Sequence, residues 1–306
     1  MQMAVSVNSR QEKQVWRCNL HNRTSQYLLP AEINAAATAM ALALSPMFDL
    51  TTTYFLIAGI AGVNPACGTL GGVALAHYGV QVGLEYEVLP TNYSSPYIPL
   101  GAKTPLGYPV FLYGTEAFEL NVALRDMALQ LASVANLTDS AAARKTRAMY
   151  PDAPANQPPN VFAGDVATSD VFFHGEFLGN YFGEYVSLLT NGSGKYCMTA
   201  QEDNGIMESF LRAGIAKLLD FSRIILLRTA ANFDRPPPGE SAISQLLYVD
   251  EGGFDESVSN LYNAGHLIID DIIKNYDSVY AAGVAPTNYI GDVFDSLPGA
   301  FPPDIG

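Results

Sequence analysis

Two polar side chains follow a long apolar run in the C-terminal half of the chain. Residues 223–230 have the aliphatic character of a buried strand, and Asn232 and Asp234 come directly after it. If the strand stays extended, every second residue from Arg228 to Asp234 lies on one side, because side chains alternate with a period of two. At the carboxyl end of a central strand, these groups are placed to hydrogen-bond a heterocycle. An Asx turn into the following prolines is the structural alternative.

Two carboxylates, Glu202 and Asp203, stand at the expected start of a helix. The helix dipole favours negative charge there, so one interpretation gives both residues a capping role and nothing more. In the functional interpretation, Glu202 accepts hydrogen bonds from two vicinal sugar hydroxyls, since one carboxylate offers two oxygens.

An aromatic pair, Phe172 and Phe173, follows Asp170. Aromatic rings offer a flat apolar face to a planar ligand, and packing in the core is the alternative for both residues. The sequence therefore contains groups that suit a sugar and a ring, although each signal taken alone also has an ordinary structural explanation.

A strand that ends in glycines must position these groups. Residues 54–64 form a continuous apolar run, and residues 68–76 return as a second strand. Gly59 and Gly62, on either side of Ala61, let backbone approach a small molecule closely, or serve tight packing alone. A dinucleotide-binding oxidoreductase is disfavoured, because no Gly-x-Gly-x-x-Gly opens a helix here.

The remaining elements alternate between helices and strands, which predicts an α/β fold. We expect helices over 31–45, 116–134, 203–219 and 257–280, a short charged helix within 143–160, strands over 54–63, 160–168 and 223–230, and a loop over 90–109.

Length and charge limit the class of protein. A chain of 306 residues, 49% hydrophobic and 15% charged, suits one large α/β domain. The net charge of −14 makes nucleic acid an unsuitable partner, because phosphates require a basic surface. The apolar runs fall short of the roughly 20 residues of a transmembrane helix. Three cysteines permit at most one disulfide, and with four histidines we expect no metal site.

The signals for a cellular compartment point in opposite directions. Glycosylation sequons occur at Asn22, Asn92, Asn136 and Asn191, which indicates secretory passage, whereas the first residues of the chain lack the apolar region of a signal peptide. Localisation and oligomeric state stay open, with a homo-oligomer as one option.

Taken in order, these motifs resemble the fungal purine nucleoside permease family, which is itself similar to the purine nucleoside and uridine phosphorylase superfamily. The resemblance covers roughly residues 33–299. The segments that carry it are 32–36, 54–65, 166–170, 199–204, 228–239 and 286–292.

The resemblance implies a nucleoside ligand and a three-layer α/β/α sandwich around a mixed sheet. Phe172 would stack on the base, and Glu202 would hold the ribose hydroxyls, with Asp203 or Glu208 as alternative equivalents. Asn232 falls where many phosphorylase-like enzymes carry the Asp that protonates the purine. An amide cannot be a general acid, so Asp234 is its rival as catalytic residue. The implied substrate-binding residues are Gly59, Ala61, Gly62, Asp170, Phe172, Phe173, Glu202, Asp203 and Arg228.

The amino terminus departs from the family pattern. Residues 1–30 lack the expected first strand, which we interpret as missing or divergent, and the glycine-bearing turn used for phosphate is replaced by residues 29–32. We expect a divergent segment over 1–30, a phosphorylase-like domain over 31–297 and a tail over 298–306. The predicted function is cleavage of the N-ribosidic bond by water, without a cofactor and with phosphate as the other option for co-substrate. Non-catalytic nucleoside binding in uptake, or an inactive copy, is the alternative.

Overall fold

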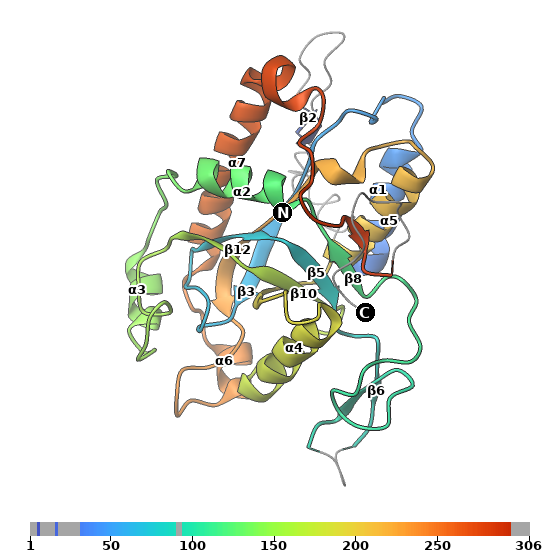
Figure 1. Cartoon of the computed structure of the whole chain (residues 1–306). Helices are drawn as coiled ribbons and strands as arrows, with labels where there is room; N and C mark the ends of the chain where they lie inside the picture. The colour runs from blue at the N-terminus through green and yellow to red at the C-terminus, as the bar shows by residue number, and fades with distance from the viewer. Residues whose placement is uncertain (1–4, 7–15, 18–30, 90–93, 295–306) are drawn as a thin grey trace.

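The computed structural model of the chain describes residues 5–6, 16–17, 31–89 and 94–294 (Figure 1). Its main strands are β3 (Phe55–Val63), β4 (Val73–Ala76), β5 (Tyr78–Gln81), β8 (Ala117–Glu119), β9 (Val161–Ala163), β10 (Asp165–Thr168), β11 (Tyr196–Ala200), β12 (Ile224–Phe233) and β13 (Gly291–Asp292). They form a nine-stranded sheet in the order β13-β8-β5-β10-β11-β3-β12-β4-β9. Two small sheets pair β1 (Val5–Ser6) with β2 (Trp16–Arg17), and β6 (Glu85–Glu87) with β7 (Tyr97–Pro99).

The large sheet is mixed. Its two longest strands, β3 and β12, run parallel, and β10 runs parallel to both β5 and β11. In contrast, β11 meets β3 antiparallel, and β4 and β8 pair antiparallel with β12 and β5. Because β3 and β12 run parallel, their carboxyl ends lie side by side, and Gly62 and Asn232 are register partners there.

Helices cover both faces of the sheet. They are α1 (Glu32–Ala43), α2 (Val122–Ala132), α3 (Ala141–Arg147), α4 (Glu176–Leu189), α5 (Asp203–Ile215), α6 (Ala242–Tyr248) and α7 (Phe254–Lys274). Figure 1 shows α1 and α5 on one side of the sheet, with α2 and α7 on the other. Phe55 and Ile57 of β3 pack with the first pair, whereas Leu56 and Ala58 pack with the second. Alternating apolar side chains thus bury both faces, and the predicted three-layer sandwich around a mixed sheet is confirmed.

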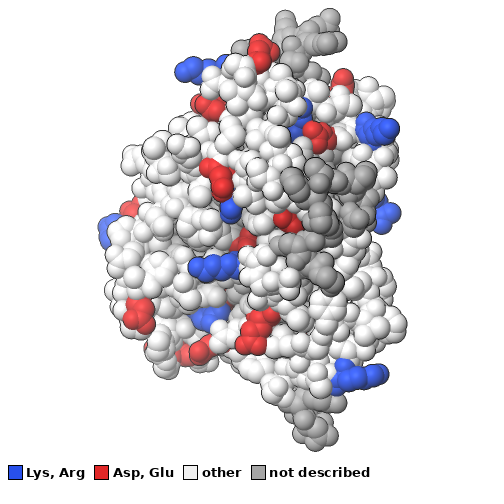
Figure 2. All heavy atoms as spheres, in the orientation of Figure 1, with Lys and Arg blue, Asp and Glu red and all other residues white. Residues whose placement is uncertain are grey.

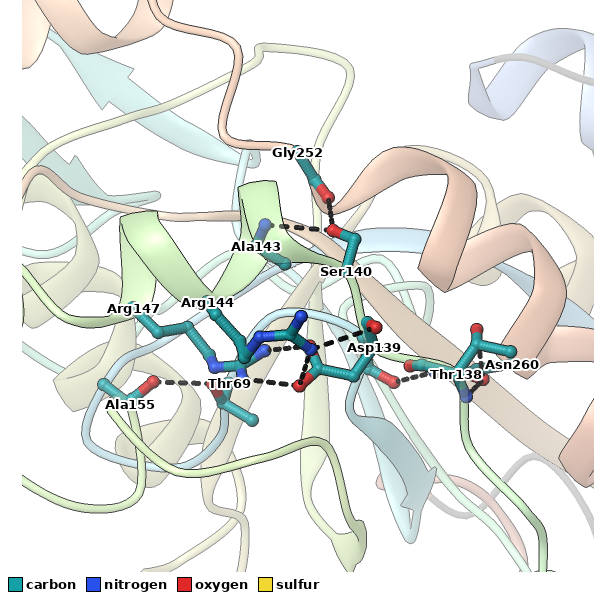
Figure 3. Close-up of polar contacts among 11 residues, drawn as sticks. Thr69, Thr138, Asp139, Ser140, Ala143, Arg144, Arg147, Ala155, Gly252 and Asn260 are labelled. Carbon is teal, nitrogen blue, oxygen red and sulfur yellow. Dashed lines mark hydrogen bonds and ion pairs between the residues drawn. The ribbon is translucent and has the colours of Figure 1, made fainter.

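A cluster of polar contacts stabilises the turn between β3 and β4 (Figure 3). Asn260 of α7 donates to the carbonyl oxygen of Gly71 at 2.8 Å and accepts from the backbone N–H of Thr138 at 2.7 Å. The same turn then pairs with β12, because the Gly71 N–H donates to the Ala230 carbonyl oxygen at 2.8 Å. Nearby, buried Arg147 makes a two-pronged ion pair with Asp139. The contacts of Gly71 with Asn260 and Ala230 hold the turn against the end of β12.

Two expected segments divide into more elements than the apolar pattern predicts. The helix expected over 116–134 begins as strand β8, and α2 starts only after Asn121, whose side chain accepts from the Leu124 N–H. The strand expected over 160–168 becomes β9 and β10, which occupy separate places in the sheet. At Gly164 between them, a Cβ atom would lie 2.6 Å from Cβ of Cys197. An apolar pattern shows that these segments are buried, but it does not show where one element ends and the next begins. The single helix over 116–134 and the single strand over 160–168 were therefore wrong predictions.

The boundaries of three other elements also need correction. Helix α5 ends at Ile215 rather than residue 219, and Lys217 adopts a positive φ of 60°. Helix α7 begins at Phe254 rather than residue 257 and ends at Lys274, followed by a π-helical turn over Tyr276–Tyr280. The loop expected over 90–109 contains β7, and its residues 90–93 lie outside the described part of the chain.

Strand β12 has a register shift between Ala230 and Asn232. Phe233, rather than Asn232 or Asp234, joins the apolar cluster that contains Ala230. An extra residue in one strand reverses the alternation of its side chains beyond that point. The expected single row from Arg228 to Asp234 therefore stops at Ala230.

One disulfide joins Cys67, in the turn after β3, to Cys197 of β11, in agreement with the cysteine count. Cys18, the sequons at Asn22 and Asn92, the tail over 298–306 and nearly all of the divergent segment over 1–30 lie outside the described residues. Within the described ranges, no helix has both the length and the apolar character needed to cross a membrane.

Candidate functional site

A pocket of about 250 Å³ lies where the ends of β3, β10, β11 and β12 meet. The described residues that line it are Ile60, Ala61, Gly62, Ser169, Val171, Phe172, Phe173, Thr199, Ala200, Gln201, Glu202, Ala231 and Asn232. Carboxyl ends of strands in open α/β sheets are the usual place for ligands. The lining includes the predicted residues Ala61, Gly62, Phe172, Phe173, Glu202 and Asn232.

Gly62 brings the two central strands close together at this pocket. Its N–H donates to Oγ1 of Thr199 at 2.9 Å. A Cβ atom on Gly62 would lie 2.8 Å from that same oxygen and 3.2 Å from Nδ2 of Asn232. A side chain would fill this corner of the pocket. Gly59, by contrast, lies in the middle of β3 opposite Arg228 and is not among the lining residues.

Arg228 holds both acidic residues at the start of α5. The guanidinium is 2% exposed and donates to Oε2 of Glu202 at 3.1 Å and to Oδ2 of Asp203 at 3.1 Å, with a second contact to Asp203. Its Nη1 also donates to the carbonyl oxygen of Ile60 at 3.2 Å. Of the two acids, Glu202 reaches the pocket with a side chain that is 15% exposed, whereas Asp203 is fully buried behind it.

Burial and charge act against each other in this group. Burial alone would lower the pKa of Arg228, but the carboxylates of Asp203 and Glu202 raise it above its ordinary value. Burial raises the pKa of Asp203, against the attraction of Arg228. A charged guanidinium therefore stays in place and fixes the orientation of the Glu202 carboxylate.

Glu32 lies outside the described lining but close to Glu202, and the sequence interpretation did not select it as a site residue. Burial, followed by repulsion from Asp170, raises its pKa to about 7, and the carboxylates of Glu202 and Asp203 add to the shift. Gln81 donates to its Oε1 at 2.5 Å. In the sequence, Glu32 resembles any acidic residue in the first turn of a helix. Only the packing of α1 beside α5 places it near the other carboxylates.

Asp170 lies beside Glu32 rather than in the pocket lining. Its Oδ1 accepts from the backbone N–H of Glu32 at 2.8 Å, so it satisfies an N-terminal amide of α1. Its backbone carbonyl oxygen accepts from Nε2 of Gln201 at 3.4 Å. The predicted substrate-binding residue therefore joins two segments at the site and adds negative charge there.

The two phenylalanines have different surroundings. Phe173 is buried, and its ring centroid lies 4.6 Å from that of Phe182 in α4. Phe172 also lines the pocket but is 55% exposed. The core-packing alternative therefore describes Phe173, while the ring of Phe172 lies at the pocket surface.

The two residues predicted to be catalytic lie apart. Asn232 lines the pocket, and its Nδ2 donates to the backbone oxygen of Phe233 at 2.9 Å. Asp234 is 1% exposed and outside the lining, where its carboxylate accepts from the hydroxyl of Tyr196 at 2.6 Å and from Nε of Arg235 at 2.8 Å. Both residues follow the bulge, but Asn232 lies in β12 and lines the pocket, whereas Asp234 lies beyond the end of that strand.

Charges on the surface are interspersed. On the face drawn in Figure 2, Lys and Arg side chains are distributed among Asp and Glu side chains and do not gather into one patch. Among the described residues, no group of three or more His, Cys, Asp or Glu side chains is arranged to hold a metal ion.

Known proteins resemble this chain along most of its length. A family model described as purine nucleoside permease (NUP) matches residues 3–285. A purine nucleoside permease of Candida albicans is 44% identical over 285 residues, which cover 90% of this chain and 70% of the relative. A probable purine nucleoside permease of Schizosaccharomyces pombe is 35% identical over 256 residues, covering 79% and 73% of the two chains.

Solved structures are more distantly similar. A 5'-methylthioadenosine/S-adenosylhomocysteine nucleosidase from Colwellia psychrerythraea, in complex with adenine, has a TM-score of 0.47 at 12% identity and covers 79% of this chain and 74% of its own. The corresponding nucleosidase from Neisseria meningitidis has a TM-score of 0.46 at 13% identity, with coverage of 89% and 87%.

Proposed function

The chain belongs to the purine nucleoside permease family, as its motifs predicted, and we propose that it binds nucleosides and cleaves their N-ribosidic bond with water. The observation that carries the proposal is the anchored carboxylate of Glu202 in a pocket that also contains Phe172 and Asn232. These groups match the sugar and the base of one ligand.

The ribose is held by Glu202. Because Arg228 uses Oε2 of this carboxylate, the orientation of the group is set before a ligand arrives. A carboxylate accepts several hydrogen bonds, so the remaining lone pairs take the vicinal 2'- and 3'-hydroxyls. Such hydrogen bonds to a charged group stabilise a complex by about 1.5–3 kcal/mol.

The base lies against Phe172, with Asn232 at its edge. The exposed ring of Phe172 provides an apolar face for a planar heterocycle. The amide of Asn232 donates and accepts hydrogen bonds, which suits the mixed donors and acceptors of a nucleobase. Neither group distinguishes one purine from another.

Glu32 serves as the base that activates water. Its pKa of about 7 leaves a substantial carboxylate fraction at neutral pH, together with enough basicity to accept a proton. In the reaction, the C1'–N bond breaks with its electron pair on the base, the oxygen of water bonds to C1', and one water proton passes to Glu32. The base takes up a proton from solvent. The sugar becomes positively charged in the transition state, and the neighbouring carboxylates stabilise that charge.

Water is a better nucleophile than phosphate for this site. The carboxylates of Glu202 and Asp203 already pair with Arg228, and the carboxylates of Glu32 and Asp170 lie close to them. An incoming phosphate would meet net negative charge at this end of the pocket. Hydrolysis therefore fits the electrostatics better than phosphorolysis.

Nucleoside binding without cleavage, as a component of uptake, is the second candidate. The observation that favours it is the amide of Asn232, which cannot protonate a leaving base. The named permease relatives agree with such a role.

The test incubates purified protein with inosine, adenosine, guanosine and uridine, with and without phosphate. Chromatography measures free base, and equilibrium dialysis of each nucleoside measures binding. Free base formed without phosphate supports the hydrolase, and strict phosphate dependence would replace it with a phosphorylase. Saturable binding without turnover would favour the uptake component. A folded protein that binds none of the nucleosides would contradict both candidates.

A further inference from the structure

The pocket contains one ionisable side chain among its described lining residues. That residue is Glu202, and its carboxylate is paired with Arg228. The other groups are apolar side chains, backbone, hydroxyls and the amides of Gln201 and Asn232. The nearest acid along β12, Asp234, is buried in its contacts with Tyr196 and Arg235. The described lining therefore offers no side chain suited to protonate a departing base, and Glu32, which lies outside that lining, is assigned to the activation of water.

We propose that the preferred substrates are ribosides whose base is already positively charged, such as an N7-alkylated purine or a pyridinium ring. This inference rests on the proposed cleavage of the N-ribosidic bond and deepens it by naming the substrate class. The absence of a general acid in the described lining matters little for such substrates, whereas it slows neutral purine nucleosides.

The chemistry of the leaving group gives the reason. When the C1'–N bond of a neutral nucleoside breaks, the electron pair leaves the base as an anion unless a proton is supplied. In a cationic riboside the same electron pair neutralises the positive charge, so the base leaves as a neutral molecule. Water supplies the new C1'–O bond, and its proton passes to Glu32. General acid catalysis contributes about 10²–10⁴-fold to a rate, and this is the factor that neutral substrates lose here.

The electrostatics of the site also favour a positively charged ring. Glu202 lies in the lining, with Glu32 and Asp170 close to it. Attraction between opposite charges strengthens where water is partly excluded. The exposed ring of Phe172 adds a face for a cation–π contact. Two independent features, the lack of an acid and the presence of negative charge with an aromatic face, thus select the same class of ligand.

The test compares guanosine with 7-methylguanosine, which differ by one methyl group and one charge. Dissociation constants come from calorimetry, and initial rates of free base come from chromatography after subtraction of uncatalysed hydrolysis. We expect tighter binding of 7-methylguanosine and a rate of cleavage at least about 10²-fold higher. A rate ratio below about 10 would overturn the inference while leaving the proposed function in place. Failure to bind either compound would instead contradict the proposed function itself.

A matched pair of variants tests the assignment to Asn232. Asn232→Asp introduces a carboxyl group that can transfer a proton. It should speed the cleavage of guanosine, so the ratio of the 7-methylguanosine rate to the guanosine rate should fall by about 10-fold or more. Asn180→Asp makes the same change in charge on the exposed side of α4, where the residue accepts from Arg235. It should keep the wild-type ratio. An unchanged ratio in Asn232→Asp, with normal thermal unfolding, would show that this position does not limit the departure of the base.

Discussion

Nη2 of Arg228 lies 3.1 Å from Oε2 of Glu202, although the two residues belong to different elements of the fold. Arg228 comes from the middle of β12, and Glu202 immediately precedes α5. The contact joins Arg228, the most buried of the described Lys and Arg residues, to the carboxylate that lines the pocket. The same guanidinium also pairs with Asp203, so one side chain links the stability of this region to the ligand binding that we propose for Glu202.

Replacing Arg228 should therefore destabilise the fold strongly. Arg228→Met leaves the buried carboxylate of Asp203 without its partner, which costs about 3–5 kcal/mol in the free energy of unfolding. Urea denaturation followed by circular dichroism measures this change. Arg212→Met removes an exposed arginine paired with Glu208 and should cost less than about 1 kcal/mol. Equal losses in the two variants would contradict the structural role of Arg228.

Glu202→Gln should weaken nucleoside binding more than it weakens the fold. The neutral amide keeps the shape of the side chain but loses charge-assisted hydrogen bonds, so we expect a dissociation constant about 10–100-fold higher. Titration calorimetry with inosine provides the measurement. Glu208→Gln, on the outer side of the same helix, is the matched control. If both variants bind like the wild type, Glu202 does not hold the ribose.

The rate of cleavage should depend on the protonation of Glu32. Because the base acts as a carboxylate, kcat/KM should fall as the pH decreases below about 7, the raised pKa of this group. Glu32→Gln should lower the rate by about 10²-fold or more and remove this acidic limb from the pH profile. Persistence of the limb in the variant would assign it to another group.

The raised pKa of Glu32 makes the fold more stable at low pH, whereas the rate of cleavage should be higher at high pH. The folded state holds its proton up to about pH 7, whereas a free Glu has a pKa of 4.5. Between these values the native state binds more protons than the unfolded chain, so the contribution is full below pH 4.5 and is lost as the pH rises to 7. Denaturation of Glu32→Gln across this range should show a smaller loss than the wild type. A steeper loss in the variant would contradict the assignment.

Reduction of the Cys67–Cys197 disulfide should lower stability. The bond closes a loop with a sequence separation of 130 residues and joins the turn after β3 to β11. A cross-link of this kind stabilises a protein by about 2–4 kcal/mol, chiefly by restricting the unfolded chain. Thermal unfolding with and without reductant measures the effect, and a Cys67→Ser, Cys197→Ser double variant should match the reduced protein. Full sensitivity to reductant in that double variant would point to another cause.

Local patterns in the sequence determined the class of fold and part of the pocket. The apolar run that ends in Gly62, and the run that precedes Asn232, predicted two buried strands, because continuous burial and glycine content are local properties. The motifs that contain Phe172 and Glu202 predicted two more residues of the lining. These signals need no knowledge of which segments become neighbours.

The tertiary structure alone decided how the charged groups meet. Glu32 and Asp170 are 138 residues apart in sequence and touch only because α1 packs beside the end of β10. The bulge in β12 moves the side chains of Asn232 and Asp234 away from the side of the strand that carries Arg228 and Ala230, and no local pattern marks it. Burial and neighbouring charge, which set the pKa of Glu32, arise from segments distant in the chain. Residue types and spacing thus predicted a nucleoside pocket, whereas the packing of helices on a mixed sheet decided which charged groups lie close to it.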